Sequence, residues 1–210
     1  MPAKKTARIS ARKEPKQARS NELVSAILEA AVQVLAKEGA QRFTTARVAE
    51  KAGVSVGSLY QYFPNKAAIL FRLQSDEWQE TTSLLRTILQ DTRMPPLRRL
   101  RTLVHVFIKS ECDEAAVRGA LDDAAPLYRD APEAKAAKAS SGRTMDSFMR
   151  EVLPGSSRAK QLLAGKLLKT TLSAVGKQFS ETPRSPAEIE SFADALADMF
   201  CAYLESLRKA

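Results

Sequence analysis

Residues 44–70 read TTARVAEKAGVSVGSLYQYFPNKAAIL, and this stretch decides how the chain around it folds. Thr44 is a good N-cap for a short helix that ends at Gly53, and Ser55 is a good N-cap for another that ends before Pro64. About three residues, one of them a glycine, join these two helices. Two short helices with such a turn between them predict a helix-turn-helix.

Amphipathic helices flank this pair on both sides. Either Ser20 or Asn21 can cap a first helix, whose apolar residues recur at helical spacing until Gly39 stops it. Asn65 can cap a fourth helix that continues to about Asp91. That helix is long enough to leave the first module and enter a second one.

The remainder of the chain also has helical patterns. Further helices are expected from Pro95 and Pro96, around residues 115–125, and over residues 132–153, 156–179 and 186–208. The composition agrees, since 33 Ala and 23 Leu far outnumber the 17 Val and Ile. We predict an all-α fold of about nine helices. An N-terminal three-helix domain with the helix-turn-helix, residues 20–72, precedes a larger helical bundle, residues 73–210.

The net charge of +9 is concentrated at the start of the 210-residue chain. Residues 1–75 carry a net charge of +8, whereas residues 76–210 carry only +1. Residues 1–19 hold seven basic side chains, one acidic one and few large apolar ones, which predicts a disordered basic arm. This polarity indicates a polyanionic partner for the first third. The arm itself fits a phosphate-contacting segment and a solubilising tail equally well.

Several classes of protein are disfavoured by what the sequence lacks. No apolar run has the length of a membrane span, and the N-terminus lacks a secretory signal, so we expect no membrane association and a cytoplasmic location. Cys112 and Cys201 are too few for a disulfide framework, and no C-x-x-C pair could hold zinc. With a single histidine, no Glu-x-x-His, no G-x-S-x-G and no phosphate-binding loop, we expect no enzyme, no metal and no cofactor.

The stretch quoted above resembles the DNA-binding signature of the TetR family of bacterial one-component regulators. The resemblance rests on the Gly-Val-Ser turn of residues 53–55, on Gly57, on the block of residues 59–63 and on Lys66 at its usual spacing. It covers residues 20–70, and beyond them only the number and length of the helices agree. The resemblance implies a dimeric regulator of transcription, in most cases a repressor that a small apolar effector releases from a palindromic double-stranded DNA operator.

A helix of a helix-turn-helix reads base edges in a major groove about 12 Å wide, while surrounding groups fix its register on the phosphates. The third helix contains no Lys or Arg, so Gln61 is the best candidate for reading a base, with adenine as its partner, and Ser58 is second. The other expected contacts match common contact positions of the family or supply charge: Thr45, Arg47, Ser55, Gly57, Tyr60, Tyr62 and Lys66. Leu59 and Phe63 are expected in the core, and packing against the first helix is an alternative role for Tyr60. The cluster of Arg98, Arg99 and Arg101 is expected on a solvated face.

In the second module, facing helices can surround an apolar cavity for an effector of unknown identity. His105, Phe107 and Phe148 are the candidate ligand contacts, although each of them could instead be a structural residue. The last two helices have wide apolar or small-residue faces, which predict a homodimer through a four-helix interface. Alternatively, both faces are used up within one subunit. As a whole, the chain could also be a non-specific architectural DNA-binding protein that relies on its basic arm.

Overall fold

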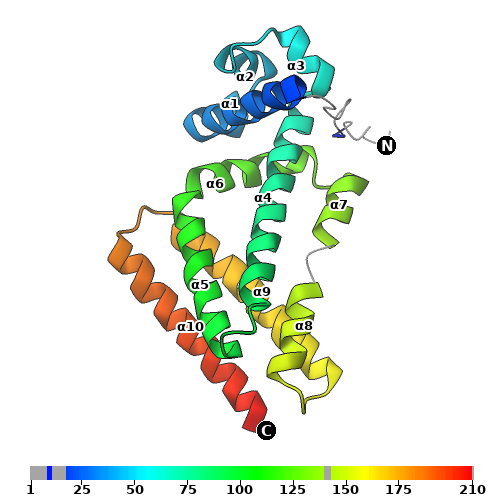
Figure 1. Ribbon diagram of the computed structural model, residues 1–210. Helices are drawn as coiled ribbons and strands as arrows, with labels where there is room; N and C mark the ends of the chain where they lie inside the picture. Colours follow the sequence, from blue (N-terminus) through cyan, green and yellow to red (C-terminus); the bar gives the residue numbers. More distant parts are fainter. Residues whose placement is uncertain (1–8, 11–17, 140–142, 210) are drawn as a thin grey trace, which may run out of the picture. The chain divides into compact units, whose positions relative to one another are not determined.

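The computed structural model describes residues 9–10, 18–139 and 143–209, and these ranges are all-α as expected, with no strand among them (Figure 1). They contain ten α-helices and one short 3₁₀ helix, where about nine helices were expected. The helices are α1 (Ala18–Arg42), α2 (Thr45–Lys51), α3 (Val56–Tyr62), α4 (Lys66–Leu89), α5 (Pro96–Asp113), α6 (Ala115–Ala124), η1 (Ala125–Leu127), α7 (Pro132–Ala139), α8 (Arg143–Val152), α9 (Arg158–Ser180) and α10 (Pro186–Lys209).

Two compact units make up the described chain, and α4 runs from one into the other. The first unit contains the described residues up to Gln79 together with Ala116–Ala139, and the second contains Glu80–Ala115 with the C-terminal part of the chain. This division differs from the boundary expected at residues 72 and 73. It also places the segment 116–139, which the sequence assigned to the second module, in the unit that holds the helix-turn-helix.

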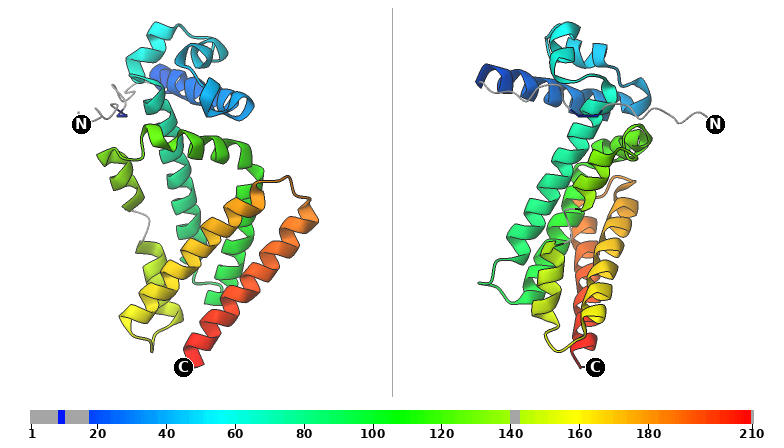
Figure 2. Two further views of the ribbon diagram at one scale, coloured as in Figure 1. Left: turned by 180° about the vertical axis from the view of Figure 1, so that it is seen from behind. Right: turned by 90° about the vertical axis from the view of Figure 1, so that its right-hand side faces the viewer.

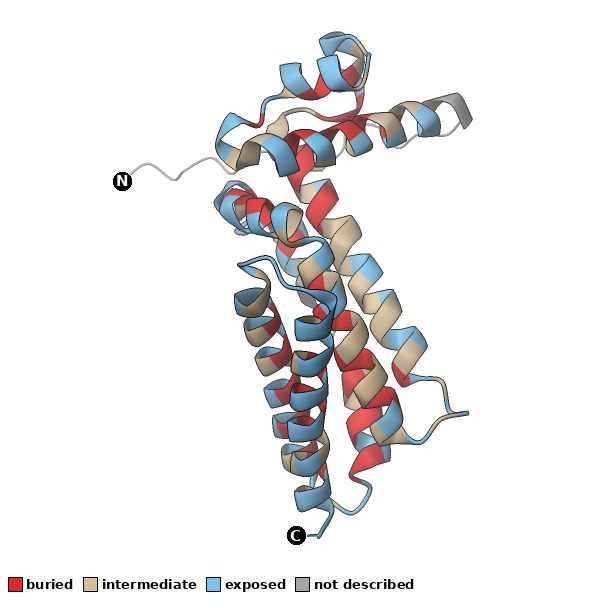
Figure 3. Cartoon of the chain, turned by 90° about the vertical axis from the view of Figure 1, so that its left-hand side faces the viewer, coloured by how far each residue is buried: buried red, intermediate tan, exposed pale blue. Residues whose placement is uncertain are grey.

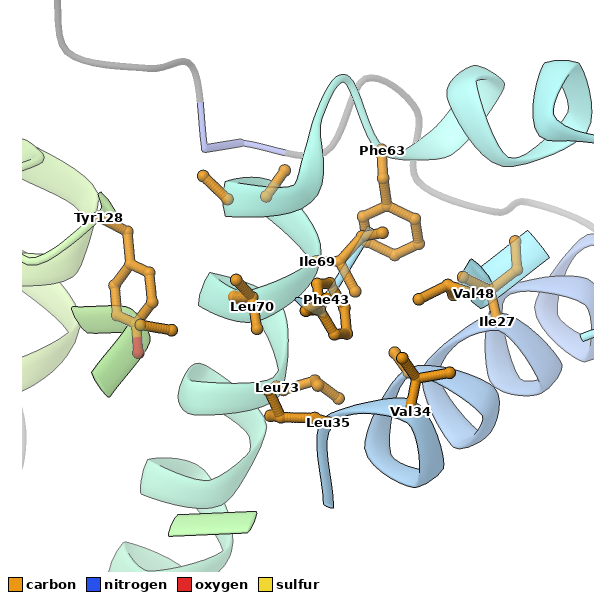
Figure 4. Close-up of a cluster of buried hydrophobic side chains, with 14 of the residues drawn as sticks. Ile27, Val34, Leu35, Phe43, Val48, Phe63, Ile69, Leu70, Leu73 and Tyr128 are labelled. Atoms are coloured by element: carbon orange, nitrogen blue, oxygen red, sulfur yellow. The ribbon is translucent and has the colours of Figure 1, made fainter. Parts of the chain in front are cut away.

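The core of the first unit gathers apolar side chains from α1, α2, α3 and α4 (Figure 4). Phe43, just before α2, is fully buried and lies near Ile69 in the middle of this cluster. Leu59 and Phe63 are buried as expected, with 0 % and 1 % of their surfaces exposed. Because α2 and α3 are short, their orientation depends on this shared core and not on helix propensity.

The segment 116–139 joins the first unit through Tyr128, which is 3 % exposed. Its hydroxyl lies 3.0 Å from the carbonyl oxygen of Leu121 and 3.2 Å from Oε1 of Gln74 on α4. Gln74 in turn donates to Glu77, and Glu77 forms an ion pair with Arg118 of α6 at 3.1 Å. A polar network therefore ties this segment to the N-terminal half of α4.

Residues 9 and 10 differ from the expectation of a fully disordered arm. Ile9 is only 2 % exposed and belongs to the core cluster of the first unit, and Ser10 Oγ donates to Glu133 Oε1 at 2.9 Å. The other residues expected in the arm lie outside the described part of the chain, apart from the beginning of α1 at Ala18. Helix α1 is kinked at Gly39, whose φ of 73° is in the left-handed region.

In the second unit, α5 is the central helix and packs against α8, α9 and α10. Figure 2 shows α9 and α10 along the same side of α5. The approach of α9 is close because two of its buried residues are glycines. A Cβ at Gly176 would lie 3.0 Å from Phe107 Cε1, and one at Gly165 would lie 3.0 Å from Met149 Cγ.

Two features differ from the expectation for the second module. The helix expected over residues 132–153 is two helices, α7 and α8, on either side of residues 140–142, which lie outside the described ranges. The sequence there is Ser-Ser-Gly, three residues that favour caps and turns over helix interiors. Arg99 is 1 % exposed and does not lie on the expected solvated face. Arg98 and Arg101 do lie there, and Arg101 forms exposed ion pairs with Asp194 and Asp198 of α10. No helix in the described ranges is long and apolar enough to cross a membrane.

Candidate nucleic-acid interface and effector cavity

Side-chain caps fix the ends of the helices in the helix-turn-helix. Thr44 Oγ1 accepts a hydrogen bond from the backbone N–H of Arg47 at 3.3 Å, and Ser55 Oγ accepts one from Ser58 at 3.0 Å. Between the two helices, Gly53 adopts a φ of 66°, a conformation that favours glycine. These three sequence expectations, two caps and one turn glycine, are confirmed.

A hydrogen bond joins the two helices on their exposed side. Thr45 Oγ1, at the N-terminus of α2, lies 3.1 Å from the hydroxyl of Tyr60 on α3. Tyr60 is 39 % exposed, so part of the residue stays accessible to a partner while its hydroxyl is bonded to Thr45. The structure thus brings together two of the expected phosphate contacts, which are 15 residues apart in sequence.

One face of α3 is exposed and uncharged. Gly57, Tyr60 and Gln61 share this face because positions i, i+3 and i+4 lie on the same side of a helix, and all three are exposed. Leu59 faces the opposite way, into the core. Ser58 is half-buried, and its Oγ lies 2.8 Å from Ser55 Oγ. Gln61 is therefore better placed than Ser58 to reach a base edge.

The remaining expected DNA contacts occupy different environments. Tyr62 is only 7 % exposed, so its ring serves mainly the core of the first unit. Arg47 is exposed and forms an ion pair with Glu38. Lys66 is half-buried at the first position of α4, directly after Asn65, whose side chain caps this helix by accepting from Ala68 N–H at 2.9 Å. The backbone of Lys66 is thus part of a capped helix start.

The second unit contains a cavity of about 60 Å³ between α4, α5, α8 and α9. Of the three candidate ligand contacts, only Phe107 lines it. The Nε2 atom of His105 instead lies 3.0 Å from Asp194 Oδ1 on α10. Phe148 is buried beneath the Arg99 guanidinium, whose carbon lies 5.5 Å from the ring centroid. Both side chains therefore have structural partners away from the cavity.

Sequence reasoning missed the buried position of Arg99. Its guanidinium donates to the carbonyl oxygen of Leu89 at the end of α4 and to Glu151 on α8. Because these partners lie 10 and 52 residues away in sequence, no local pattern reveals them. Sequence reasoning also missed the polar residues around the cavity, of which Lys169 on α9 is the one that carries a charge.

Two family models match this chain. Residues 27–73 match the model described as bacterial regulatory proteins of the tetR family, and residues 95–207 match the one described as a tetracyclin repressor-like C-terminal domain. Solved structures with the same fold include a putative TetR-family transcriptional regulator from Mesorhizobium loti, at a TM-score of 0.69 and 19 % identity. That match covers 89 % of this chain and 98 % of the other. The fatty acid degradation regulator FadR from Bacillus halodurans gives a TM-score of 0.66 at 18 % identity, over 89 % and 96 % of the two chains.

Curated relatives include the nucleoid occlusion factors SlmA of Vibrio campbellii and Edwardsiella ictaluri. Each is 36 % identical over 83 residues, or 39 % of this chain. The match spans only about two fifths of the length of these relatives, 42 % and 41 % respectively. The C-terminal family model, in contrast, matches more than half of the chain by itself. The chain therefore belongs to the TetR family of bacterial regulatory proteins.

Proposed function

We propose that this chain is a cytoplasmic, homodimeric repressor of transcription that binds a near-palindromic operator and leaves it when a small, largely apolar effector binds. The observation that carries the proposal is the exposed, uncharged face of α3, which two capped helices and a shared core hold in place. A rigid helix with exposed amide and hydroxyl groups is suited to reading base edges in a major groove.

The chemistry of the side chains indicates which residues would contact bases and which would contact phosphates. Gln61 offers the paired donor and acceptor that match adenine, while Ser58 has a smaller, partly engaged hydroxyl. Thr45, Tyr60 and Lys66 offer two hydroxyls and a charge for phosphate oxygens, and Ser55, Gly57 and Tyr62 complete the expected contact set at the margins. Arg47 can exchange Glu38 for a phosphate at little cost, because exposed ion pairs contribute little to stability.

Dimerisation is supported by an apolar stripe on the outer side of the last two helices. On α9, Leu163 is 64 % exposed and Leu167 47 % exposed, and Thr170 and Ala174 continue the stripe at helical spacing. On α10, Met199 is 52 % exposed. The exposed faces of these C-terminal helices are visible in Figure 3. A second copy of the chain is the partner that fits best, since a two-fold axis gives a four-helix interface and doubles the length of DNA that is read.

Effector response is supported by the course of α4. Its N-terminal half belongs to the unit that holds α3, and its C-terminal half contributes Thr81, Thr82 and Leu85 to the cavity. An effector that favours one arrangement of these residues shifts the population toward that arrangement. If this state separates the two α3 helices beyond the roughly 34–36 Å between successive major grooves, affinity for the operator falls.

DNA selection from a random pool with the purified full-length chain tests this function directly. We expect a consensus with two-fold symmetry and two half-sites about one helical turn apart. Enrichment of a single, non-symmetric half-site would contradict the dimeric reading. A pool without any consensus would instead support the second candidate function, a non-specific architectural protein, which the net charge of +6 on residues 1–19 favours.

Deletion of residues 1–8 separates these two candidates further. This deletion removes Lys4, Lys5 and Arg8 but keeps Ile9, whose burial makes a longer deletion a risk to the fold. A repressor should keep its consensus and lose affinity, and the slope of log K against log[salt] should become smaller by up to about 2.7 per subunit. An architectural protein should lose most of its binding to every sequence.

A further inference from the structure

The cavity of the second unit has an apolar floor. Phe107 of α5, Met145 of α8 and Leu172 of α9 line it, and all three are buried, with exposed fractions of 8 %, 8 % and 5 %. Leu85 of α4 adds a half-buried aliphatic side chain. A ligand would therefore place a hydrocarbon part here, where its burial contributes about 25 cal/mol per Å².

The rim of the cavity is polar and carries charge of one sign. Thr81, Thr82, Thr144 and Ser173 line it with hydroxyl-bearing side chains, and Lys169 adds an ammonium. These five residues are half-buried or exposed, unlike those of the floor. Within the described part of the chain, no carboxylate lines the cavity. An anionic group at the rim would therefore lie beside a cationic side chain and several hydroxyl groups.

From this arrangement we propose that the cavity binds a small organic acid, with its hydrocarbon part on Phe107, Met145 and Leu172 and its carboxylate at Lys169. The proposal rests on the effector role of this cavity and names the class of effector. A cavity of about 60 Å³ is small beside the roughly 300–1,000 Å³ of pockets for drug-sized ligands. A short monocarboxylate fits this size, and a longer one must displace side chains of the floor.

Two glycines of α9 determine how far the floor recedes. A Cβ at Gly176 would lie 3.0 Å from Phe107 Cε1, and one at Gly165 would lie 3.3 Å from Met145 Cγ. Both distances are shorter than ordinary van der Waals contact between carbon atoms. Phe107 and Met145 therefore rest in spaces that only glycine leaves open. A methyl group at either position would force neighbouring side chains, among them a floor residue, to shift.

The charge requirement can be tested on the full-length chain with hexanoate, hexan-1-ol and hexylamine, which share a six-carbon chain and differ in head group. We expect hexanoate to raise the melting temperature, and calorimetry to show that it binds about ten-fold more tightly than hexan-1-ol. Lys169→Gln should remove this preference and leave the binding of hexan-1-ol unchanged. Lys166→Gln, on the same helix but outside the cavity, should behave like the parent chain.

The floor can be tested separately with Gly176→Ala. This variant should weaken the binding of hexanoate and hexan-1-ol alike, because it displaces Phe107, which lines the hydrocarbon site. Gly119→Ala is a matched control on another helix, where a Cβ meets nothing within 4 Å, and it should bind both compounds like the parent chain. If Gly176→Ala fails to fold, Lys169→Gln still decides the charge requirement.

Equal affinity for the three compounds, or the same preference in Lys169→Gln, would overturn the proposal, as would the absence of binding by carboxylates of four to eight carbons. The effector role fails in a different way. Hexanoate that binds through Lys169 but leaves affinity for the selected DNA unchanged would support the site and contradict the response proposed for it.

Discussion

We propose that Gln61 and Lys66 make two different kinds of DNA contact, which single substitutions can separate. Gln61 is exposed on α3, the helix proposed to enter the major groove, and Lys66 begins α4, where the proposed partner is a phosphate of the duplex. Gln61→Ala should lower discrimination at one base pair of each half-site by about 1–3 kcal/mol. Lys66→Ala should weaken operator and random DNA by the same factor and reduce the salt slope by about 1 per half-site.

Binding titrations of both variants, on operator and on scrambled DNA at several salt concentrations, measure this difference. Lys51→Ala is a useful control for charge alone, because Lys51 is exposed at the end of α2 and not on α3. If Gln61→Ala lost affinity equally on both DNAs, its side chain would be a phosphate contact and the assignment would be incorrect.

Glu188, in the first turn of α10, links helix capping to acid stability. Its carboxylate accepts hydrogen bonds from the backbone N–H and the hydroxyl of Ser185 at 2.8 and 2.7 Å, and these bonds lower the pKa of Glu188. Since the pKa is lower in the folded state than in the unfolded one, the contribution to stability is complete above the ordinary value of 4.5. It is lost as the pH falls through the folded value.

We therefore expect Glu188→Gln to be less stable than the parent chain at pH 7 and nearly equal to it near pH 3. Urea unfolding at both pH values gives the two differences in free energy. Glu190→Gln, at an exposed position two residues further on, controls for the loss of a charge on the same helix. A stability difference for Glu188→Gln that stayed constant with pH would show that the capping carboxylate does not titrate as described.

At the scale of elements, the segment 116–139 extends the unit that holds the helix-turn-helix. Tyr128 is the residue that anchors it, and burial, together with the charges of Asp122 and Glu77, raises the pKa of its phenol. Tyr128→Phe should destabilise the chain by about 1–3 kcal/mol, because two buried acceptors lose their donor. Tyr60→Phe, at a more exposed hydroxyl, should cost less than about 0.5 kcal/mol.

Chemical unfolding of both variants measures this contrast. The pH dependence adds an independent signature of Tyr128. Because its pKa is higher in the folded state, the stabilisation is complete below about pH 10 and falls as the pH rises further. The Tyr128→Phe variant should lack this loss of stability at alkaline pH. Equal stability of Tyr128→Phe and the parent chain would mean that other contacts hold the segment.

The elements that sequence predicted well are those with local causes. Thr44, Ser55 and Asn65 each cap a helix by accepting a hydrogen bond from the backbone N–H three residues further on. Both partners of each bond therefore lie within one short stretch of sequence. The helix-turn-helix and its core could therefore be predicted together with the exposure of Tyr60 and Gln61 on α3.

Residues with distant partners were not predictable in this way. His105 pairs with Asp194, which is 89 residues away, and Arg99 pairs with Glu151. The sequence could therefore offer His105 only as a candidate ligand contact or a structural residue, and it wrongly placed Arg99 on a solvated face. Nothing in the sequence distinguishes Lys169 from other helix lysines, because the cavity beside it is formed with residues of α4, α5 and α8. Expectations for the cavity depend on tertiary packing, whereas those for α2 and α3 depend on local sequence.

At the scale of the molecule, a dimer is required for a symmetric operator, and the stripe on α9 and α10 is where it should form. Leu163 and Leu167 expose large aliphatic side chains that a monomer would leave in water. Leu163→Glu would place a carboxylate from each subunit in that interface, and an uncompensated charge there is costly. We expect the dimer dissociation constant to rise by about 100-fold or more, measured by sedimentation or light scattering.

Leu162→Glu is the matched control, because Leu162 is also exposed, at 44 %, but lies about 100° around α9 from Leu163. It introduces the same side chain outside the stripe and should leave the dimer intact. Loss of the dimer should also lower affinity for the full operator much more than affinity for an isolated half-site, since each subunit reads only its own half. If Leu163→Glu remained dimeric and Leu162→Glu did not, the interface would lie on another face of α9, and the two α3 helices would be spaced by a different symmetry axis.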